Sequence, residues 1–450
     1  MVAWIFAILT LPGLGILLYW LVASDRLRRK VSRRRRRVAH LLAQYRRWSE
    51  LERHRAGREA EDPLPEDFTG IEQLGSRLVG MPATGGNQVA ILEEANATYA
   101  ALEDAIRAAQ HHIHLEYYIW QPDDTGRNFR SLIVEAARRG VQCRLLLDAV
   151  GCWRLDREFL HPLVEAGVGV AFFMPLWPSP LRKRWSLHLR NHRKIAVFDG
   201  QTAFIGSQNI GDEYRGRLQR LSPWYDTHMR VVGPAAFCIQ QTFAEDWYFA
   251  TRQQLDVKTY FTVPERPGQS FVQILPTGPD QRLSTLAHIL FAAVALARSS
   301  IRIATPYFVP DPATRMALTY ACCRGVQVRL VLPTRSDSNL SLWAARSFYQ
   351  ELSDAGVEIH EYDGGVLHSK LVTIDDRWCM LGSANMDARS FRLNFEVTAL
   401  IYDQHVAAGL ARSIDAFCAD ARRITLREIW QRGSLRRIGE GAARLFAPLL

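Results

Sequence analysis

Several absences narrow the function of this 450-residue chain before any motif is considered. Its seven cysteines contain no C-x-x-C pair and are odd in number, which favours a reducing compartment over a disulfide framework or a cysteine metal cage. No G-x-x-x-x-G-K-[ST] loop occurs, which disfavours nucleotide hydrolysis. No RNA-recognition signature with base-stacking aromatics is present either. The sequence therefore predicts a protein without a redox, nucleotide or metal cofactor.

Charge is missing from the first 24 residues, MVAWIFAILTLPGLGILLYWLVAS. A helix of about 20 residues crosses the hydrocarbon core of a bilayer. The segment lacks both the basic start and the A-x-A cleavage site of a signal peptide. We therefore expect an uncleaved transmembrane anchor over residues 1–24. The arginine-rich run that follows, DRLRRKVSRRRRRVAH, places the rest of the chain on the cytoplasmic side.

The remaining composition is that of a globular protein, with 48% hydrophobic and 23% charged residues. This length accommodates about two or three domains. The net charge of +10 is concentrated in the early arginine run and indicates an anionic partner surface, either lipid or nucleic acid. Next to a membrane span, such arginines meet anionic headgroups, and they also serve as a solvated linker. We expect residues 25–75 to form this basic juxtamembrane and linker region.

An internal repeat organises the rest of the chain. The stretch RRGVQCRLLLD (138–148) matches CRGVQVRLVLP (323–333), and IHLEYYIW (113–120) matches IRIATPYFV (301–309). Short apolar runs alternate with helical periods in both copies, which predicts an α/β fold. A repeat of this size implies two copies of one domain. We expect homologous domains over 76–262 and 263–433, each a mixed β-sheet flanked by helices and packed with pseudo-two-fold symmetry.

The tail SLRRIGEGAARLFAPLL predicts an amphipathic helix within residues 434–450. Its apolar face consists of Leu435, Ile438, Ala442, Leu445 and Phe446, and three arginines (Arg436, Arg437 and Arg444) lie off that face. Two interpretations stay open at this point. The apolar face packs against the protein body, or it lies on a bilayer surface.

Each repeat carries the polar motif H-x-K-x(4)-D followed by G-S-x-N at the same distance. The first copy comprises His192, Lys194, Asp199, Ser207 and Asn209; the second comprises His368, Lys370, Asp375, Ser383 and Asn385. At average residue usage one such triplet arises by chance in a chain of this length about one time in twenty. Two copies in register are far less probable by chance, so the motifs indicate a shared site.

The motif residues favour phosphodiester chemistry. Positions i and i+2 of a strand face the same way, so each histidine shares a face with its lysine. One neutral imidazole is a nucleophile, and a second, with an ordinary pKa of about 6.5, serves as acid and base. The surrounding lysines, asparagines and serines are donors that suit the nonbridging oxygens of a phosphodiester. The cluster His111, His112 and His114 does not converge on one ion, so no metal site is predicted.

The paired motifs resemble those of the phospholipase D superfamily. Further stretches, TPYFVP, GGVLHSK, GSANMDARSFRLNFE and RLFAPLL, are similar over nearly the whole chain to bacterial cardiolipin synthases of this type. The resemblance implies a phosphatidyltransferase in which His192 attacks the phosphorus of one phosphatidylglycerol while His368 protonates the departing glycerol. His368 then deprotonates the headgroup hydroxyl of a second phosphatidylglycerol, which takes the phosphatidyl group to give cardiolipin. Assigning the nucleophile to His192 follows the commoner pattern of the family.

The resemblance also assigns the remaining residues. The motif lysines and asparagines hold phosphate oxygens, while Ser207 and Ser383 add hydrogen bonds or close a turn. Asp226 in PWYDTHMRV and Glu396 in LNFEVTALI resemble the carboxylates that orient the histidines. Asp199 and Asp375 belong to the catalytic motif, yet their position at a strand-to-turn junction favours a structural role in which they bond loop backbone.

The family further implies a bacterial inner membrane location, phosphatidylglycerol and cardiolipin as lipid partners, and no nucleic-acid partner. Related synthases commonly begin with two spans, whereas this sequence shows one. Two alternatives compete. A phosphodiesterase acting on other phospholipids or nucleic acid would suit the basic balance, but the arginines cluster beside the predicted span. A noncatalytic lipid-binding scaffold is disfavoured because both motifs are intact.

Overall fold

The computed structural model describes residues 12–13, 64–175, 189–219, 222–262, 264–281, 283–336 and 338–445. The predicted transmembrane segment lies outside this part of the chain except for Pro12 and Gly13, as does most of the predicted basic region. Within the described residues, no helix combines the length and the apolar character needed to span a bilayer.

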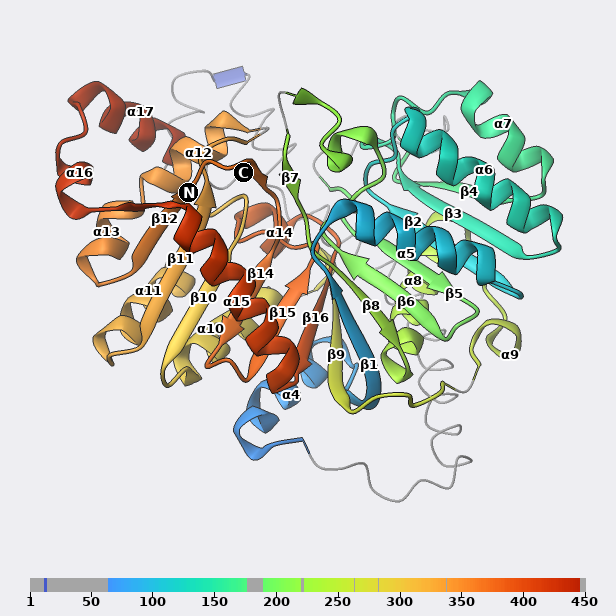
Figure 1. The fold of residues 1–450 in the computed structure, drawn as a ribbon, viewed down its shortest axis with the longest axis horizontal. Helices are drawn as coiled ribbons and strands as arrows, with labels where there is room; N and C mark the ends of the chain where they lie inside the picture. The colour runs from blue at the N-terminus through green and yellow to red at the C-terminus, as the bar shows by residue number, and fades with distance from the viewer. Residues whose placement is uncertain are drawn as a thin grey trace.

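A single mixed sheet of 15 strands runs through both halves (Figure 1), in the order β17-β12-β11-β10-β14-β15-β16-β9-β1-β8-β6-β5-β2-β3-β4. The first half contributes β1 (Thr84–Leu92), β2 (His112–Tyr117), β3 (Gln142–Asp148), β4 (Gly169–Phe173), β5 (Ile195–Phe198), β6 (Thr202–Gly206) and β8 (His228–Val232). The second contributes β9 (Ser270–Thr277), β10 (Ser300–Ala304), β11 (Gln327–Pro333), β12 (Glu358–Tyr362), β14 (Leu371–Ile374), β15 (Trp378–Gly382), β16 (Glu396–Tyr402) and β17 (Arg422–Ile424). A separate parallel pair joins β7 (Trp224–Tyr225) to β13 (Val366–Leu367).

The strand order shows the predicted repeat. Reading outward from the central antiparallel β9–β1 pair, β16 corresponds to β8, β15 to β6, β14 to β5, and β10-β11-β12 to β2-β3-β4. In both halves these three strands are parallel to one another and the inner ones are antiparallel, and the second half adds β17 as an antiparallel edge strand next to β12. The two predicted domains therefore share one sheet, joined edge to edge through β1 and β9, instead of having two separate sheets.

Helices cover both faces of the sheet. They are α4 (Glu66–Val79), α5 (Ala95–Ala108), α6 (Asp124–Arg138), α7 (Arg157–Glu165), η2 (Asp212–Arg215), α8 (Pro234–Thr251), α9 (Val257–Tyr260), α10 (Thr285–Leu296), α11 (Pro312–Cys323), α12 (Asn339–Arg346), α13 (Tyr349–Asp354), α14 (Ala388–Arg392), α15 (Gln404–Asp420), α16 (Leu426–Trp430) and α17 (Ser434–Leu445). Several begin at an aspartate whose side chain accepts a hydrogen bond from the first turn, as Asp156 does from the Phe159 N–H. In Figure 1, α15 lies in front of the second half of the sheet, and α5 and α6 lie in front of the first.

Helix α4 crosses the predicted boundary between the linker region and the first domain. It runs across the expected boundary between residues 75 and 76, and its Phe68 and Ile71 are buried in the hydrophobic core of the second half. Gln273 of β9 fixes it by donating hydrogen bonds to the Glu72 carbonyl and to Ser76 Oγ. Residues 66–79 thus pack on the second half although they precede the first half in sequence, because their amphipathic face meets α10 and β9.

Helix α17 confirms the predicted C-terminal helix over Ser434–Leu445 but packs by an unexpected face. Glu440 and Ala443 are its buried residues, and Gly439 lies against Trp343 of α12. Leu435 and Ile438 of the predicted apolar face are 86% and 68% exposed. For Leu435 and Ile438, the interpretation that the apolar face packs against the protein body is therefore wrong. Phe446 lies outside the described residues.

Candidate active site

The two histidine motifs meet where the two halves join. The H-x-K part of each motif immediately precedes a strand, β5 or β14, instead of lying within it as the sequence suggested. The His192 N–H donates a 2.8 Å hydrogen bond to the Phe395 carbonyl, and the His368 N–H donates one of 2.8 Å to the Tyr225 carbonyl. Each histidine segment is therefore aligned by backbone from the other half.

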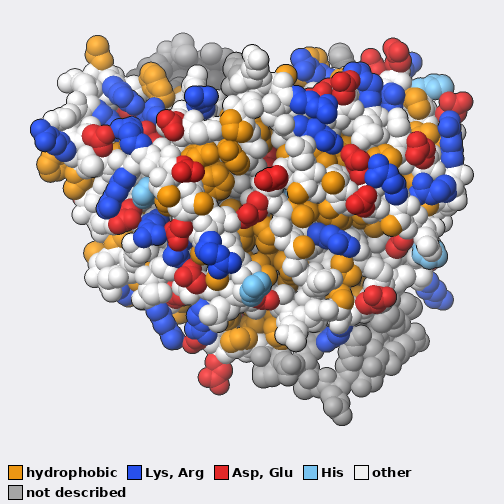
Figure 2. Space-filling model, in the orientation of Figure 1, with side chains coloured by type: hydrophobic (Ala, Val, Ile, Leu, Met, Phe, Trp, Pro, Cys, Tyr) orange, Lys and Arg blue, Asp and Glu red, His pale blue; other side chains and the backbone are white. Residues whose placement is uncertain are grey.

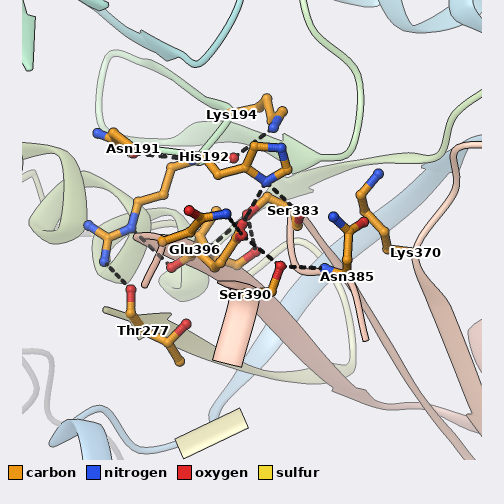
Figure 3. A network of polar contacts seen from close by, with 12 residues as sticks. Asn191, His192, Lys194, Thr277, Lys370, Ser383, Asn385, Ser390 and Glu396 are labelled. Atoms are coloured by element: carbon orange, nitrogen blue, oxygen red, sulfur yellow. Dashed lines mark hydrogen bonds and ion pairs between the residues drawn. The ribbon is translucent and has the colours of Figure 1, made fainter. Parts of the chain in front are cut away.

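Each imidazole is also held by a carboxylate from the opposite half. His192 Nδ1 lies 3.0 Å from Glu396 Oε2, at the start of β16 (Figure 3). His368 Nδ1 lies 2.7 Å from Asp226 Oδ1, between β7 and β8. The two carboxylates that the sequence suggested as orienting residues are thus brought to the histidines, and the pairing is crossed between the repeats.

Glu396 is fully buried and fixed from several sides. Ser383 Oγ donates to it at 2.6 Å and Ser390 Oγ at 3.0 Å, as Figure 3 shows. Burial alone would raise the pKa of Glu396, but its contact with His192 and the charge of Lys194 hold it below its ordinary value. Asp226 behaves likewise, since burial opposes and His368 lowers its pKa, and Trp224 Nε1 donates to it at 2.7 Å. Both carboxylates are therefore ionised near neutral pH.

His192 has the electronic state of a nucleophile. Burial lowers its pKa to about 4, although the charge of Glu396 opposes this shift. The imidazole is therefore neutral at pH 7. A carboxylate accepting at Nδ1 fixes the N–H on that nitrogen and leaves the lone pair on Nε2. The Tyr118 ring packs edge-on against the imidazole, with centroids 4.9 Å apart.

The two motif lysines lie beside the histidines. Lys194 Nζ donates a 2.7 Å hydrogen bond to the His192 carbonyl and lies 5.2 Å from the Tyr118 ring centroid. Burial lowers the pKa of Lys194 to about 7, with Glu396 opposing the shift and Lys370 adding to it. Lys370 Nζ lies 3.0 Å from His368 Nε2, and Figure 3 shows its side chain next to Asn385. Two amines therefore border the space between the imidazoles.

The two motif asparagines differ in their surroundings. Asn385 is buried, and its Oδ1 has no hydrogen-bond partner among the described residues. Asn209 accepts from the Ile119 N–H at 3.1 Å and donates to the Tyr214 hydroxyl at 3.2 Å. Phosphate binding by Asn209 and Asn385 stays a prediction.

The hydrogen bonds of Ser207 and Ser383 favour one of their two predicted roles. Ser207 Oγ accepts from the Thr227 N–H at 3.0 Å and donates to the Thr227 carbonyl at 3.1 Å. Ser383 Oγ accepts from the Val397 N–H at 3.0 Å and donates to Glu396. These hydroxyls are engaged by strand backbone and by an orienting carboxylate, which corresponds to the turn-closing alternative.

Asp199 and Asp375 bind the backbone of neighbouring loops, and their grouping with the catalytic residues stays a prediction. Asp199 accepts hydrogen bonds from the backbone N–H groups of residues 110, 111 and 112 at 2.9, 2.8 and 2.9 Å. Asp375 accepts from residues 298, 299 and 300 at 2.8, 2.7 and 2.9 Å. Each lies at the far end of its strand from the histidine, with φ of 53° and 55° respectively. These contacts favour the structural interpretation.

Sequence reasoning missed Arg193, between His192 and Lys194. Its Nε donates to the Glu396 carbonyl and its Nη2 to the Thr277 carbonyl, both at 3.0 Å. Its Nη1 forms a buried ion pair with Asp246. Because the second motif has Ser369 at the equivalent place, the shared pattern gave no signal for this residue. Arg193 ties the first motif to the strands that present Glu396.

Asn191 and Asp148 were missed for the same reason. Asp148, at the end of β3, accepts a 2.9 Å hydrogen bond from the Asn191 N–H. The Asn191 amide donates to the buried Glu116 at 2.5 Å. Together they fix the segment that leads into His192. The repeat equivalent of Asp148 is a proline, so comparing the halves does not reveal it.

Comparisons with known proteins agree with this geometry. The family model described as cardiolipin synthase, PLD-like domain, matches residues 102–217 and 290–417. The cardiolipin synthase of Geobacillus kaustophilus is 38% identical over 390 residues, covering 86% of this chain and 77% of that protein. That of Geobacillus thermodenitrificans is 36% identical, covering 100% and 88%. The crystal structure of phosphatidylserine synthase from Haemophilus influenzae shares the fold, with a TM-score of 0.64 at 15% identity over 86% of this chain and 100% of that one.

Proposed function

Because the chain belongs to the cardiolipin synthase family of phospholipase D-like proteins, we propose that it transfers a phosphatidyl group between two phosphatidylglycerol molecules. The products are cardiolipin and glycerol. The observation that carries this proposal is the pair of histidines, each held at Nδ1 by a buried carboxylate from the other half. Such a pair supplies a nucleophile and an acid to one phosphorus atom.

In the first step, Nε2 of His192 attacks the phosphorus and forms a phosphorus–nitrogen bond. The bond from phosphorus to the glycerol oxygen breaks, and His368 gives that oxygen a proton. Asp226 stabilises the imidazolium of His368 before the transfer. In the structure, the Lys370 amine lies 3.0 Å from His368 Nε2. When the substrate binds, a phosphate oxygen attracts this amine. His368 Nε2 is then free to face the leaving glycerol oxygen.

In the second step, the headgroup hydroxyl of another phosphatidylglycerol attacks the phosphatidyl-histidine. His368 takes the hydroxyl proton, the phosphorus–nitrogen bond breaks, and His192 returns to its neutral form. One phosphodiester replaces another, so the reaction balances without an external energy source. Transfer instead of hydrolysis requires that water be scarce at the intermediate. The side chains of His192 and His368 are only 12% and 10% exposed, which supports this requirement.

We also propose that residues 1–24 anchor the chain in the bacterial inner membrane, with both catalytic halves on the cytoplasmic side. The uncharged segment and the arginine-rich run behind it support this location. It places the site beside the bilayer that contains both lipid substrates.

The test is to incubate the purified full-length chain in vesicles with labelled phosphatidylglycerol, without added metal or nucleotide. We expect cardiolipin and glycerol in equal amounts, and a loss of about 10³-fold or more in His192→Ala. His111→Ala is the matched control, because His111 is an exposed histidine outside the site. Phosphatidic acid without cardiolipin would make the protein a hydrolase. No lipid turnover at all would favour a nucleic-acid substrate.

A further inference from the structure

The C-terminal helix α17 presents bulky apolar side chains outward. Leu435 and Ile438 are 86% and 68% exposed, and Leu445 is also exposed. The helix contacts α12 through its small residues, with Gly439 and Ala443 on the packed side. A surface helix normally turns its apolar face to the core. In α17 that face is turned away from the described part of the protein.

The charged residues of α17, like its apolar residues, are unevenly distributed between the buried and the exposed face. Its single acidic residue, Glu440, is buried and paired with Arg432 and Arg436 at 3.3 Å. Arg437 and Arg444 are exposed on the same helix. The accessible surface of α17 therefore combines leucine, isoleucine and arginine without an exposed carboxylate. This composition is typical of helices that lie in the interface of an anionic bilayer.

Other exposed apolar residues come from loops at the edge of the sheet where the active site lies. Trp153, 71% exposed, follows β3, and its loop packs on the site through Cys152 Sγ, 3.4 Å from the Tyr118 carbonyl. Leu218 lies between Asn209 and Asp226 in sequence. Arg154 lies over the Trp153 ring, 5.7 Å from its centroid. Tryptophan and arginine are residues that favour the membrane–water interface.

The second half contributes Leu340 and Trp343 of α12, which supports α17. The ends of β11 and β12 reach the site through Tyr362, whose ring packs against Tyr225, the residue that accepts from His368. In Figure 1, α12, α17 and β7 lie along the upper margin of the molecule. Figure 2 shows orange apolar and blue basic side chains interspersed along that margin. Both halves thus place such residues on segments next to those that contact the site.

We propose that this rim, defined as Trp153, Leu218, Leu340, Trp343, Leu435, Ile438 and Leu445 with the arginines of α17, docks the catalytic halves onto an anionic phospholipid bilayer. The inference rests on the proposed function, because an enzyme that joins two membrane lipids must bring its site to their headgroups. Rim residues of both halves lie on or next to segments that contact the residues around the histidines, so docking there would bring a lipid headgroup to the site without the lipid leaving the bilayer. Charge complementarity selects an anionic lipid surface over a neutral one.

The test compares two forms of one substrate in the full-length chain. Cardiolipin formation is measured on phosphatidylglycerol in vesicles and on short-chain phosphatidylglycerol dispersed as monomers. We expect Ile438→Asp to lower the ratio of vesicle rate to monomer rate about tenfold, because a carboxylate replaces a membrane-inserted side chain and repels anionic headgroups. Met316→Asp is the matched control, since Met316 on α11 is also 68% exposed but lies off the rim. An unchanged ratio in Ile438→Asp would overturn the proposal.

A second readout needs neither turnover nor a substitution on the rim. Amide hydrogen exchange is measured on the full-length His192→Ala chain in nanodiscs of phosphatidylcholine with and without phosphatidylglycerol. We expect exchange of residues 434–445 to slow at least threefold with the anionic lipid, while α11 is unchanged. Equal exchange of α17 in both nanodiscs would overturn the proposal and indicate that protein covers the helix. If the unsubstituted chain makes no cardiolipin from either substrate form, the proposed function fails, and this measurement still tests docking.

Discussion

His192 and His368 occupy equivalent motif positions, but different side chains surround them. His192 is followed by the buried Arg193 and packs against Tyr118, whereas His368 is followed by Ser369 and packs against Trp224. The closer carboxylate contact belongs to His368, at 2.7 Å against 3.0 Å for His192. A shorter charge-assisted hydrogen bond favours the imidazolium form. This asymmetry supports His192 as the nucleophile and His368 as the acid.

The pH profile of kcat/KM follows from two buried groups. Because burial lowers the pKa of His192 to about 4, the nucleophile stays neutral well below pH 6 and activity falls only near pH 4. Because burial lowers the pKa of Lys194 to about 7, the charge that we propose to hold the phosphate is lost above neutral pH. We therefore expect a plateau between about pH 4 and pH 7 when monomeric phosphatidylglycerol is the substrate.

Lys194→Arg separates the two limbs of that profile, because arginine keeps its charge. The basic limb should move to higher pH in this variant, and the acidic limb should stay in place. An acidic limb near pH 6.5 in the unsubstituted chain would show a histidine with an ordinary pKa and contradict the burial argument. A basic limb that is unchanged in Lys194→Arg would assign that limb to another group.

The aspartates in the turns after β5 and β14 show how a motif residue can stabilise a turn without taking part in the reaction. Asp375 accepts backbone hydrogen bonds from residues 298–300 at φ 55°, a backbone region that Asn tolerates better than Ala. We expect Asp375→Ala to lower the free energy of unfolding by about 3 kcal/mol and Asp375→Asn by about 1 kcal/mol. Urea denaturation measures both values.

Activity per folded molecule distinguishes this structural role from catalysis. Both Asp375 variants should keep it within about threefold at a temperature where they remain folded. Asp376→Asn is the neighbouring control, since Asp376 has a similar φ of 54° and its side chain pairs with Arg302. A folded, stable Asp375→Asn protein without activity would contradict the assignment and return Asp375 to the catalytic group.

The sequence predicts that an element exists where its pattern of apolar residues is clear. It does not predict the orientation or placement of an element where these depend on packing. The strands of the repeat follow from short apolar runs and the existence of α17 from a helical period, and the structure contains them. The orientation of α17 depends on how Gly439 fits against Trp343, which no periodicity records. The placement of α4 on the second half depends on a contact with Gln273 that is distant in sequence.

At the scale of the whole molecule, the crossed pairing follows from the joined sheet. The β9–β1 pair places β16 and β8 on either side of the centre, and Glu396 and Asp226 lie at the starts of these strands. Each carboxylate therefore reaches the histidine of the other half. The repeat revealed both carboxylates as equivalent residues, but their partners depend on how the halves dock. Neither half alone contains a complete histidine–carboxylate pair.

The crossed pairing of histidines and carboxylates predicts which substitutions have the same effect on activity. Glu396→Gln should behave like a His192 variant, and Asp226→Asn like a His368 variant, although each pair is split between the repeats. A phosphatidyl ester of p-nitrophenol separates the two roles, because nitrophenolate departs without a proton and makes the acid dispensable. We expect the Asp226→Asn burst of nitrophenol to stay within about tenfold of the unsubstituted chain, and that of Glu396→Gln to fall about 100-fold.

The natural donor provides the control for this experiment. With phosphatidylglycerol, both variants should lose activity, because glycerol needs the proton from His368 and the attack needs an oriented His192. The reverse order with the nitrophenyl ester, in which Glu396→Gln keeps the burst and Asp226→Asn loses it, would make His368 the nucleophile. Equal losses in both variants would show that the carboxylates act together on the whole site and not each through its own histidine across the junction of the halves.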